Sequence, residues 1–217
     1  MTMIDEATFR RIEAEARTFF EQARGSHGWD HTERVLALCL HIGRSEGADL
    51  DVLRLAAVLH DIGRTEQDEG QGKVCHAEIG ARLARDLLHA HGLAEPLVKR
   101  VVACVATHRF RGGNRPVSLE ERILFDADKL DSIGAVGIGR AFLFAGEVGA
   151  RLHDPTADHT KTKAYTADDT AHREFVVKLS RIRDRMLTGE GRRLAEERHA
   201  YMVEFFARLD REVAGDL

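Results

Sequence analysis

Two histidines and two aspartates stand next to apolar segments of the chain, in a combination that suits a divalent metal ion. His31 opens a predicted helix, and His60 and Asp61 follow the apolar run at residues 55–59. Asp128 lies among apolar neighbours further along the chain. A carboxylate at the edge of a buried helix is costly unless it is paired or binds a cation. A mixed nitrogen and oxygen set favours Mn, Fe, Co, Ni or Zn over Ca, and four ligands leave about two positions of a six-coordinate ion for water and substrate.

Amphipathic helices are the elements that must position these residues. Apolar residues recur at helical spacing through most of the chain, and no segment alternates as a strand would. Ser118 and Glu121 form a capping box for one helix. Residues 66–73 and 151–167 are predicted loops. The helices are expected over residues 5–24, 30–45, 49–59, 76–91, 96–108, 118–131, 133–149, 168–187 and 191–213. The prediction is therefore an all-α fold of about seven to nine helices. We expect one domain over residues 1–217, with a core at about 25–150 and a C-terminal helical addition at about 168–213.

The composition excludes several classes of protein. The chain has 217 residues, of which 43% are hydrophobic and 31% charged, as in a folded protein with a core. A net charge of −4 argues against nucleic acid as the main partner. Three widely spaced cysteines indicate reduced thiols. No apolar run is long enough for a signal peptide or a membrane span, so we expect a cytoplasmic protein without a membrane partner, as a monomer or homodimer.

The sequence around these four residues resembles the HD superfamily of metal-dependent phosphohydrolases. The resemblance rests on Gly-Trp-Asp-His ending at His31, on Leu-His-Asp-Ile-Gly around His60 and Asp61, and on Asp-Ala-Asp-Lys-Leu around Asp128. The segment 131–142 is similar to a stand-alone bacterial subgroup that includes nucleotide pyrophosphohydrolases. The similarity extends over about residues 25–210.

The resemblance implies a helical fold in which one divalent ion is bound by His31, His60, Asp61 and Asp128. The metal is Mn, Co, Ni, Mg, Fe or Zn, and a second ion is left open. The family's last aspartate ligand lies in a motif like Ala-Asp-Lys-Leu, which favours Asp128 as the fourth ligand. Asp126 is then either a partner of the ligands or a carboxylate on the helix surface.

Further residues are expected to serve catalysis and phosphate binding. His76 and His108 lie in short motifs whose histidines complete a second metal site in some HD relatives. They could instead bind phosphate or be structural. The general base stays open between Asp61 acting through water, His76, Glu66 and Asp68, and we group Asp61, His76 and His108 as the catalytic candidates. A polyphosphate needs more charge neutralisation than one divalent ion gives. The candidate phosphate-binding residues are Arg64, Arg109, Lys129, His172 and Lys178.

The expected function is hydrolysis of a nucleotide, with a small-molecule nucleotide as the substrate. The subgroup resemblance favours release of pyrophosphate from a nucleoside triphosphate, leaving the monophosphate. One alternative is a dinuclear phosphodiesterase or a hydrolase of dinucleotide polyphosphates. Another is a regulatory module that binds nucleotides without turnover.

Overall fold

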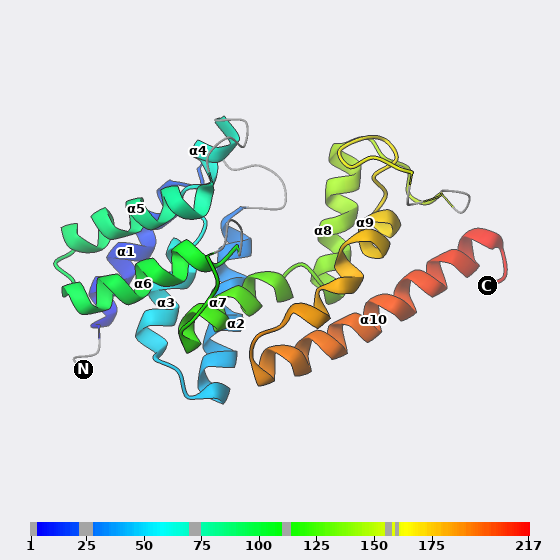
Figure 1. Cartoon of the computed structure of the whole chain (residues 1–217). Coiled ribbons are helices and arrows are strands. Elements are labelled where there is room, and N and C mark those ends of the chain that lie inside the picture. Colours follow the sequence, from blue (N-terminus) through cyan, green and yellow to red (C-terminus); the bar gives the residue numbers. More distant parts are fainter. Residues whose placement is uncertain (1–3, 22–27, 70–74, 110–113, 155–157, 159–160) are drawn as a thin grey trace. The chain divides into compact units, whose positions relative to one another are not determined.

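All regular structure in the described part of the chain is helical (Figure 1), which confirms the predicted all-α fold. In this computed structural model the described residues are 4–21, 28–69, 75–109, 114–154, 158 and 161–217, with the backbone alone for 67–69. The α-helices there are α1 (Glu6–Thr18), α2 (Trp29–Glu46), α3 (Leu50–Leu59), α4 (Arg64–Glu69), α5 (His76–Ala90), α6 (Glu95–Thr107), α7 (Leu119–Leu130), α8 (Gly134–Glu147), α9 (Ala171–Val177) and α10 (Gly189–Ala214). Within those residues no helix has both the length and the apolar character needed to cross a membrane.

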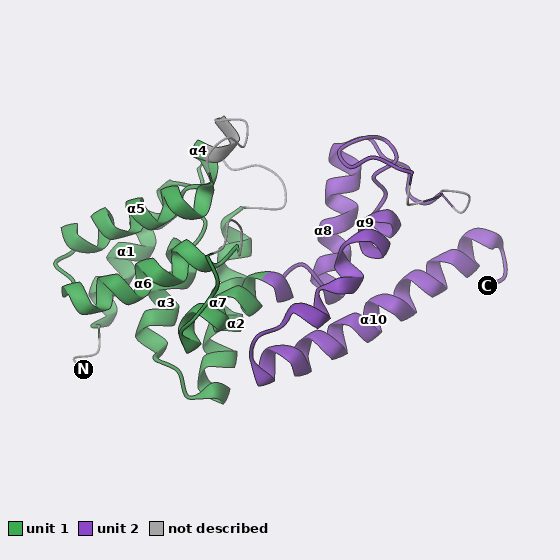
Figure 2. Cartoon of the chain, in the orientation of Figure 1, with its two compact units in different colours: residues 1–128 green, residues 129–217 purple. Residues whose placement is uncertain are grey.

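The chain divides into two compact units, residues 1–128 and 129–217 (Figure 2). The first unit holds α1 to α6 and most of α7, and the second holds α8 to α10. Helix α8 packs against α9 and α10. The predicted extents of a core and a C-terminal addition stay a prediction, and each unit is described by itself below.

Helix α3 is the centre of the first unit. Seven of its ten residues are buried, and it packs against α1, α2 and α6, while α5 packs against α4 and α6. A helix that is apolar on nearly all sides is stable only when it is surrounded. Because His60 and Asp61 follow its last turn directly, the same burial carries them into the interior of the unit.

A polar network at the surface joins α3 to α6 and α7. Asp49 caps α3 by accepting hydrogen bonds from the backbone N–H groups of Asp51 and Val52. Arg100 of α6 reaches both Asp49, at 2.7 Å, and Glu120 of α7, at 3.2 Å. A single exposed pair contributes little, but this network fixes three helices whose residues meet again at the site.

The predicted capping box at the start of α7 is confirmed. The Glu121 backbone N–H donates to Ser118 Oγ at 3.2 Å, and the Ser118 N–H donates to Glu121 Oε1 at 3.4 Å. Glu121 Oε2 also accepts from the hydroxyl of Thr107 at 3.2 Å. Thr107 is the last residue of α6, so the cap links the end of α6 to the start of α7.

Three expected element bounds differ from the structure. The first helix ends at Thr18, before the predicted residue 24, and residues 22–27 lie outside the described residues. The predicted loop 66–73 begins as the end of α4, and residues 70–74 are again outside the description. The helix predicted over 168–187 is α9 followed by two 3₁₀ turns, Leu179–Arg181 and Arg183–Arg185. Both helix types bury residues three apart, as Leu179 and Ile182 are, so apolar spacing alone could not separate them.

Gly63 marks a close approach between the turn after Asp61 and the start of α5. A Cβ at Gly63 would lie 2.5 Å from the carbonyl oxygen of His76 and 2.6 Å from the backbone N of Gly80. A Cβ at Gly80 would instead meet its neighbours at 3.5 Å, which is ordinary contact. The absence of a side chain at Gly63 therefore sets the spacing between Asp61 and His76.

We expect Gly63→Ala to lower the free energy of unfolding by about 1–3 kcal/mol, because the methyl group forces two backbone segments apart. Gly80→Ala is the matched control and should be neutral or stabilising by up to about 1 kcal/mol, since alanine favours a helix over glycine. Urea denaturation of both variants measures the difference. Equal effects of the two substitutions would contradict this account of Gly63.

Candidate metal centre

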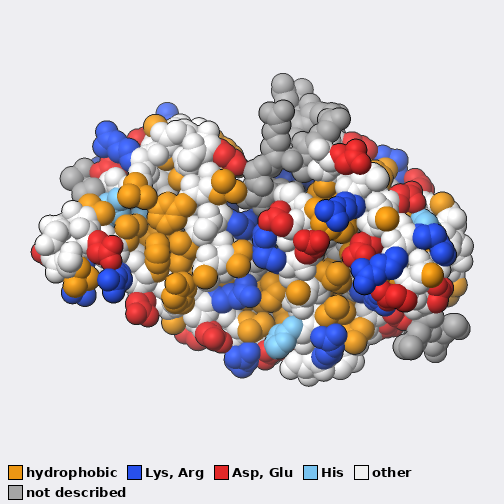
Figure 3. All heavy atoms as spheres, turned by 180° about the vertical axis from the view of Figure 1, so that it is seen from behind, with side chains coloured by type: hydrophobic (Ala, Val, Ile, Leu, Met, Phe, Trp, Pro, Cys, Tyr) orange, Lys and Arg blue, Asp and Glu red, His pale blue; other side chains and the backbone are white. Residues whose placement is uncertain are grey.

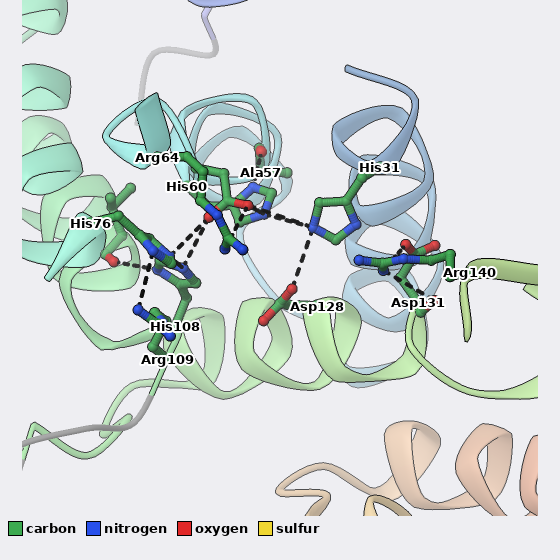
Figure 4. Close-up of polar contacts among 12 residues, drawn as sticks. His31, Ala57, His60, Arg64, His76, His108, Arg109, Asp128, Asp131 and Arg140 are labelled. Atoms are coloured by element: carbon green, nitrogen blue, oxygen red, sulfur yellow. Dashed lines mark hydrogen bonds and ion pairs between the residues drawn. The ribbon is translucent and has the colours of Figure 1, made fainter. Parts of the chain in front are cut away.

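The four predicted ligands converge inside the first unit (Figure 4). His31 lies in the first turn of α2, His60 and Asp61 follow α3, and Asp128 lies in the last turn of α7. His31 Nε2 is 3.3 Å from His60 Nε2, 3.4 Å from Asp128 Oδ1 and 3.9 Å from Asp61 Oδ2. His60 Nε2 is 3.7 Å from Asp61 Oδ2. Three helices and the turn after α3 thus bring residues up to 97 positions apart to one point.

The tautomer of His60 is fixed by the backbone. Its Nδ1 lies 2.7 Å from the carbonyl oxygen of Ala57, which can only accept, so Nδ1 carries the proton. In the neutral ring Nε2 is then an unprotonated lone pair. This lone pair lies near His31 and Asp61, and a ligand atom of Asp128 is within 4.8 Å; neither carboxylate can donate to it when ionised. A cation at this point would satisfy the lone pair and both carboxylates together.

The donor atoms have the separations that a small divalent cation requires. Bonds of about 2.0–2.2 Å from one ion hold neighbouring nitrogen and oxygen atoms about 3.0–3.6 Å apart. Four of the separations among these atoms, at 3.3–3.9 Å, need only small adjustments to meet that range, and ligand atoms of His31, His60 and Asp128 lie within 4.8 Å of one another. The residues therefore fit the ion that their chemistry suggests.

Burial keeps His60, and the surrounding imidazoles keep Asp61, in the forms that bind metals. His60 is 0% exposed, and burial lowers its pKa to about 4 against the charge of Asp61, so the ring is neutral at pH 7. Burial by itself would raise the pKa of the Asp61 carboxyl, which is 4% exposed. The imidazoles of His60, His108 and His76 outweigh burial and hold this pKa well below its usual range. A neutral imidazole and an ionised carboxylate are the ligand forms.

A second group of side chains lies on the other side of Asp61. His76, the first residue of α5, places Nε2 at 3.0 Å from Asp61 Oδ1. His108, the residue after α6, places Nε2 at 3.5 Å from the same oxygen and at 3.1 Å from His76 Nε2. The two oxygens of Asp61 thus serve different groups, Oδ2 with His31 and His60, and Oδ1 with His76 and His108.

The tautomers of His76 and His108 explain the contacts of this second group. Arg109 Nη1 lies 3.2 Å from His76 Nδ1, and because a guanidinium only donates, Nδ1 is the acceptor. Neutral His76 then carries its proton on Nε2 and donates it towards Asp61 Oδ1. His108 Nδ1 donates to the carbonyl oxygen of Val105 at 2.7 Å, so neutral His108 offers a lone pair at Nε2. Burial lowers the pKa of His76, which favours this neutral form.

The aspartates on either side of Asp128, Asp126 on α7 and Asp131 just after it, have different surroundings. Asp131 forms an ion pair of 2.7 Å with Arg140 in the second unit. Asp126 is fully buried, which excludes its alternative as a surface carboxylate. Neither belongs to the two metal-ligating groups of the first unit, whose α7 member is Asp128.

Two of the predicted phosphate-binding residues, Arg64 and Arg109, lie beside the centre. Arg64 Nη1 is 3.9 Å from Asp61 Oδ2, and its Nε is buried without a hydrogen-bond partner among the described residues. Arg109 contacts His76 as above. Lys129 follows Asp128 on α7. His172 and Lys178 belong to the second unit, where His172 lies near Asp210 and Lys178 pairs with Glu174.

The two other candidates for the general base, Glu66 and Asp68, have no described contact with the centre. Glu66 on α4 is exposed, and the side chain of Asp68 lies outside the described residues. The sequence analysis missed the carbonyl groups of Ala57 and Val105, which orient His60 and His108. Both lie three residues before their histidine, so a histidine just after a helix end was the available indication.

Comparisons with known proteins agree with this geometry. The sequence profile of the HD domain matches residues 28–133. YpgQ of Bacillus subtilis is 34% identical over 193 residues, which cover 87% of this chain and 85% of YpgQ. The crystal structure of YpgQ in complex with ADP has a TM-score of 0.73 at 30% identity and covers 95% of both chains. An HD-superfamily hydrolase from Bacillus thuringiensis has a TM-score of 0.77 at 25% identity, over 96% of this chain and 98% of that one.

A more distant similarity is to larger enzymes. Ribonuclease Y of Cutibacterium acnes is 30% identical over 181 residues, which cover 74% of this chain but 32% of that enzyme. The profile match contains all four residues that converge at the centre. Because YpgQ is 34% identical over 87% of this chain and the HD profile matches residues 28–133, the chain belongs to the HD-domain family of metal-dependent phosphohydrolases.

Proposed function

We propose that this protein hydrolyses a nucleoside or deoxynucleoside triphosphate to the monophosphate and pyrophosphate, with one divalent ion held by His31, His60, Asp61 and Asp128. The observation that carries the proposal is the facing set of two carboxylates, a second imidazole and the His60 lone pair, which leaves coordination positions for other ligands. The crystal structure of the relative YpgQ with ADP supports a nucleotide as the substrate.

Each group at the centre has a chemical task in this proposal. The bound ion supplies Lewis acidity towards a phosphoryl oxygen and makes a water molecule more acidic. Arg64, with its buried and unsatisfied Nε–H, binds the phosphate chain and balances its charge. His76 holds a transferable proton at Nε2, and Arg109 fixes that tautomer. His108 offers the lone pair that can accept a proton, so the pair can accept one proton and give another as the bond to the leaving group breaks.

The protonation pattern also favours a single tightly bound ion over a dinuclear centre. For His76 to ligate a metal through Nε2, it must give up the proton on that atom, and neutral His76 must then carry a proton at Nδ1. The contact from Arg109 to Nδ1 opposes that change. The alternative is a dinuclear centre acting on a phosphodiester or a dinucleotide polyphosphate, and the similarity to ribonuclease Y favours keeping it as the second candidate.

The surface gives no support for nucleic acid as the main substrate. On the face seen in Figure 3, basic and acidic side chains are interspersed, in keeping with the net charge of −4. Binding to a nucleic-acid backbone is instead typical of a clustered basic surface. A small anionic substrate needs only a few placed cations.

The first test of this proposal is product analysis with a panel of nucleotides in the presence of Mn²⁺, Co²⁺, Ni²⁺, Mg²⁺, Fe²⁺ or Zn²⁺. We expect a monophosphate and pyrophosphate in equal amounts. His60→Ala should abolish turnover, because it removes a ligand, while His89→Ala, on the exposed face of α5, should retain it. Diphosphate plus phosphate, or nucleoside plus triphosphate, would contradict cleavage between the α- and β-phosphates. A nucleotide-dependent function that survives in His60→Ala would favour the regulatory module.

The number of ions separates the two candidate centres. Elemental analysis of the purified protein after dialysis should find one tightly held equivalent per chain, lost in Asp128→Asn. His76→Gln should keep that equivalent and lower kcat by about 10²- to 10⁴-fold, since it removes a proton-transfer group and leaves the ligands. Two equivalents in the wild type, with one lost in His76→Gln, would establish the dinuclear alternative.

The role of Arg64 predicts a change in substrate binding. Loss of a charged hydrogen bond to phosphate costs about 1.5–3 kcal/mol, so Arg64→Ala should raise KM for a triphosphate by about 10- to 100-fold. Arg64→Lys should recover part of the loss because it keeps the charge. Steady-state kinetics measures both, and the metal content serves as the control for an intact centre. An unchanged KM in Arg64→Ala would remove this residue from the binding site.

A further inference from the structure

A third group of side chains that could hold a metal ion lies in the second unit. It consists of His153 in the segment after α8, His172 in the first turn of α9, and Asp210 near the end of α10. His153 Nε2 lies 2.6 Å from Asp210 Oδ1, and His172 Nδ1 lies 3.7 Å from the same oxygen. One potential ligand atom from each residue can be chosen so that all three lie within 4.8 Å of one another.

The environment of His153 is unusual for a histidine in an irregular segment. Its side chain is only 4% exposed, and its Nδ1 is buried without a hydrogen-bond partner among the described residues. A buried polar atom that lacks a partner costs free energy. Among the described residues, Nε2 is thus the ring nitrogen of His153 that has a hydrogen-bond partner, Asp210, while Nδ1 has none.

The rings of His153 and His172 are spaced like those of His31 and His60, but they are stacked, whereas the planes of His31 and His60 are 68° apart. The centroids of the His153 and His172 rings are 5.3 Å apart, with planes 17° from parallel. In the HD centre the neighbouring imidazoles are separated by 5.1–5.3 Å. Phe206 lies on the ring of His172 at 5.3 Å and limits its rotation. Two imidazoles thus stand beside one carboxylate, and ring stacking restrains both of them.

The contacts of the two imidazoles with Asp210 differ in length. At 3.7 Å the contact between His172 Nδ1 and Asp210 Oδ1 exceeds hydrogen-bond distance, whereas His153 occupies the same oxygen at 2.6 Å. A cation with bonds of about 2.0–2.2 Å would replace the hydrogen bond between His153 and Asp210, release its proton to solvent, and bind both imidazoles and the carboxylate. Two imidazoles and one carboxylate form a set that favours Zn²⁺, Co²⁺, Ni²⁺ or Cu²⁺ over Mg²⁺ or Ca²⁺.

We propose that His153, His172 and Asp210 form a second, independent site for a divalent transition-metal ion. The side chain of Asp210 is 46% exposed, so the ion can enter from solvent and water can complete its coordination. Binding would join the segment after α8 and the start of α9 to the end of α10, positions separated by up to 57 residues. The site would stabilise the second unit. It also gives His172 a partner that disfavours phosphate, since the Asp210 carboxylate repels an anion.

The test uses the full chain with the HD centre disabled by His60→Ala and Asp128→Asn, so that the two sites are read separately. Zn²⁺ titration followed by calorimetry should find one site in this background, with no comparable binding of Mg²⁺. Saturating Zn²⁺ should raise the midpoint of thermal unfolding by about 5 °C or more. Adding Asp210→Asn should remove both the binding and the thermal shift.

Matched substitutions keep the result interpretable. Asp216→Asn, on an exposed aspartate beyond α10, should leave Zn²⁺ binding unchanged, and so should His199→Phe, at a histidine of α10 outside the group. His153→Phe keeps an aromatic ring in the buried position and should abolish Zn²⁺ binding. Absence of a Zn²⁺ site in the disabled background would overturn the proposal, as would equal binding by the Asp210→Asn and Asp216→Asn variants. Because nucleotide turnover is not the readout, failure of the proposed hydrolase activity would leave this result unaffected.

Discussion

The carboxylate of Asp61 is buried at the end of an apolar helix, and four imidazoles surround it within 3.9 Å. An ionised carboxylate cannot remain in such a place without compensation, because burial opposes its charge. Beside Oδ1 the compensation is the proton on Nε2 of His76, and beside Oδ2 it would be a cation shared with the lone pair of His60. The rest of the first unit can be understood as the framework that delivers these groups to one carboxylate.

That framework consists of helix ends. His31 begins α2, His60 follows α3, His76 begins α5 and His108 follows α6. Residues at helix ends have backbone groups nearby that are not used within the helix, and the carbonyl groups of Ala57 and Val105 serve in this way. Each orients an imidazole three residues later. A local backbone device is thus used twice, and it sets which nitrogen of each ring faces Asp61.

The sequence was sufficient for the helical fold and for the residues that meet at the centre, for different reasons. Helical spacing of apolar residues predicted most elements, and the sequence motifs around His31, His60 and Asp128 indicated the family. Sequence spacing could not show that Asp131 is taken by Arg140, or that Asp126 is buried, since this depends on how α7 is rotated. The group of His153, His172 and Asp210 was also missed as a group. Its members come from three segments whose proximity only tertiary packing creates.

The two sides of Asp61 indicate why one carboxylate can serve both metal binding and proton transfer. On the Oδ2 side, His60 is fixed with a lone pair towards the centre, which suits a cation and excludes a proton near neutral pH because its pKa is about 4. On the Oδ1 side, Arg109 fixes His76 with a proton towards the centre, which suits hydrogen bonding and opposes a second cation. The guanidinium of Arg109 therefore fixes the tautomer of His76, as the carbonyl of Ala57 fixes that of His60. The two rings carry their proton on opposite nitrogens. Under the proposed function, the contact from Arg109 to His76 would favour one ion over two, although the second group offers enough ligands for another ion.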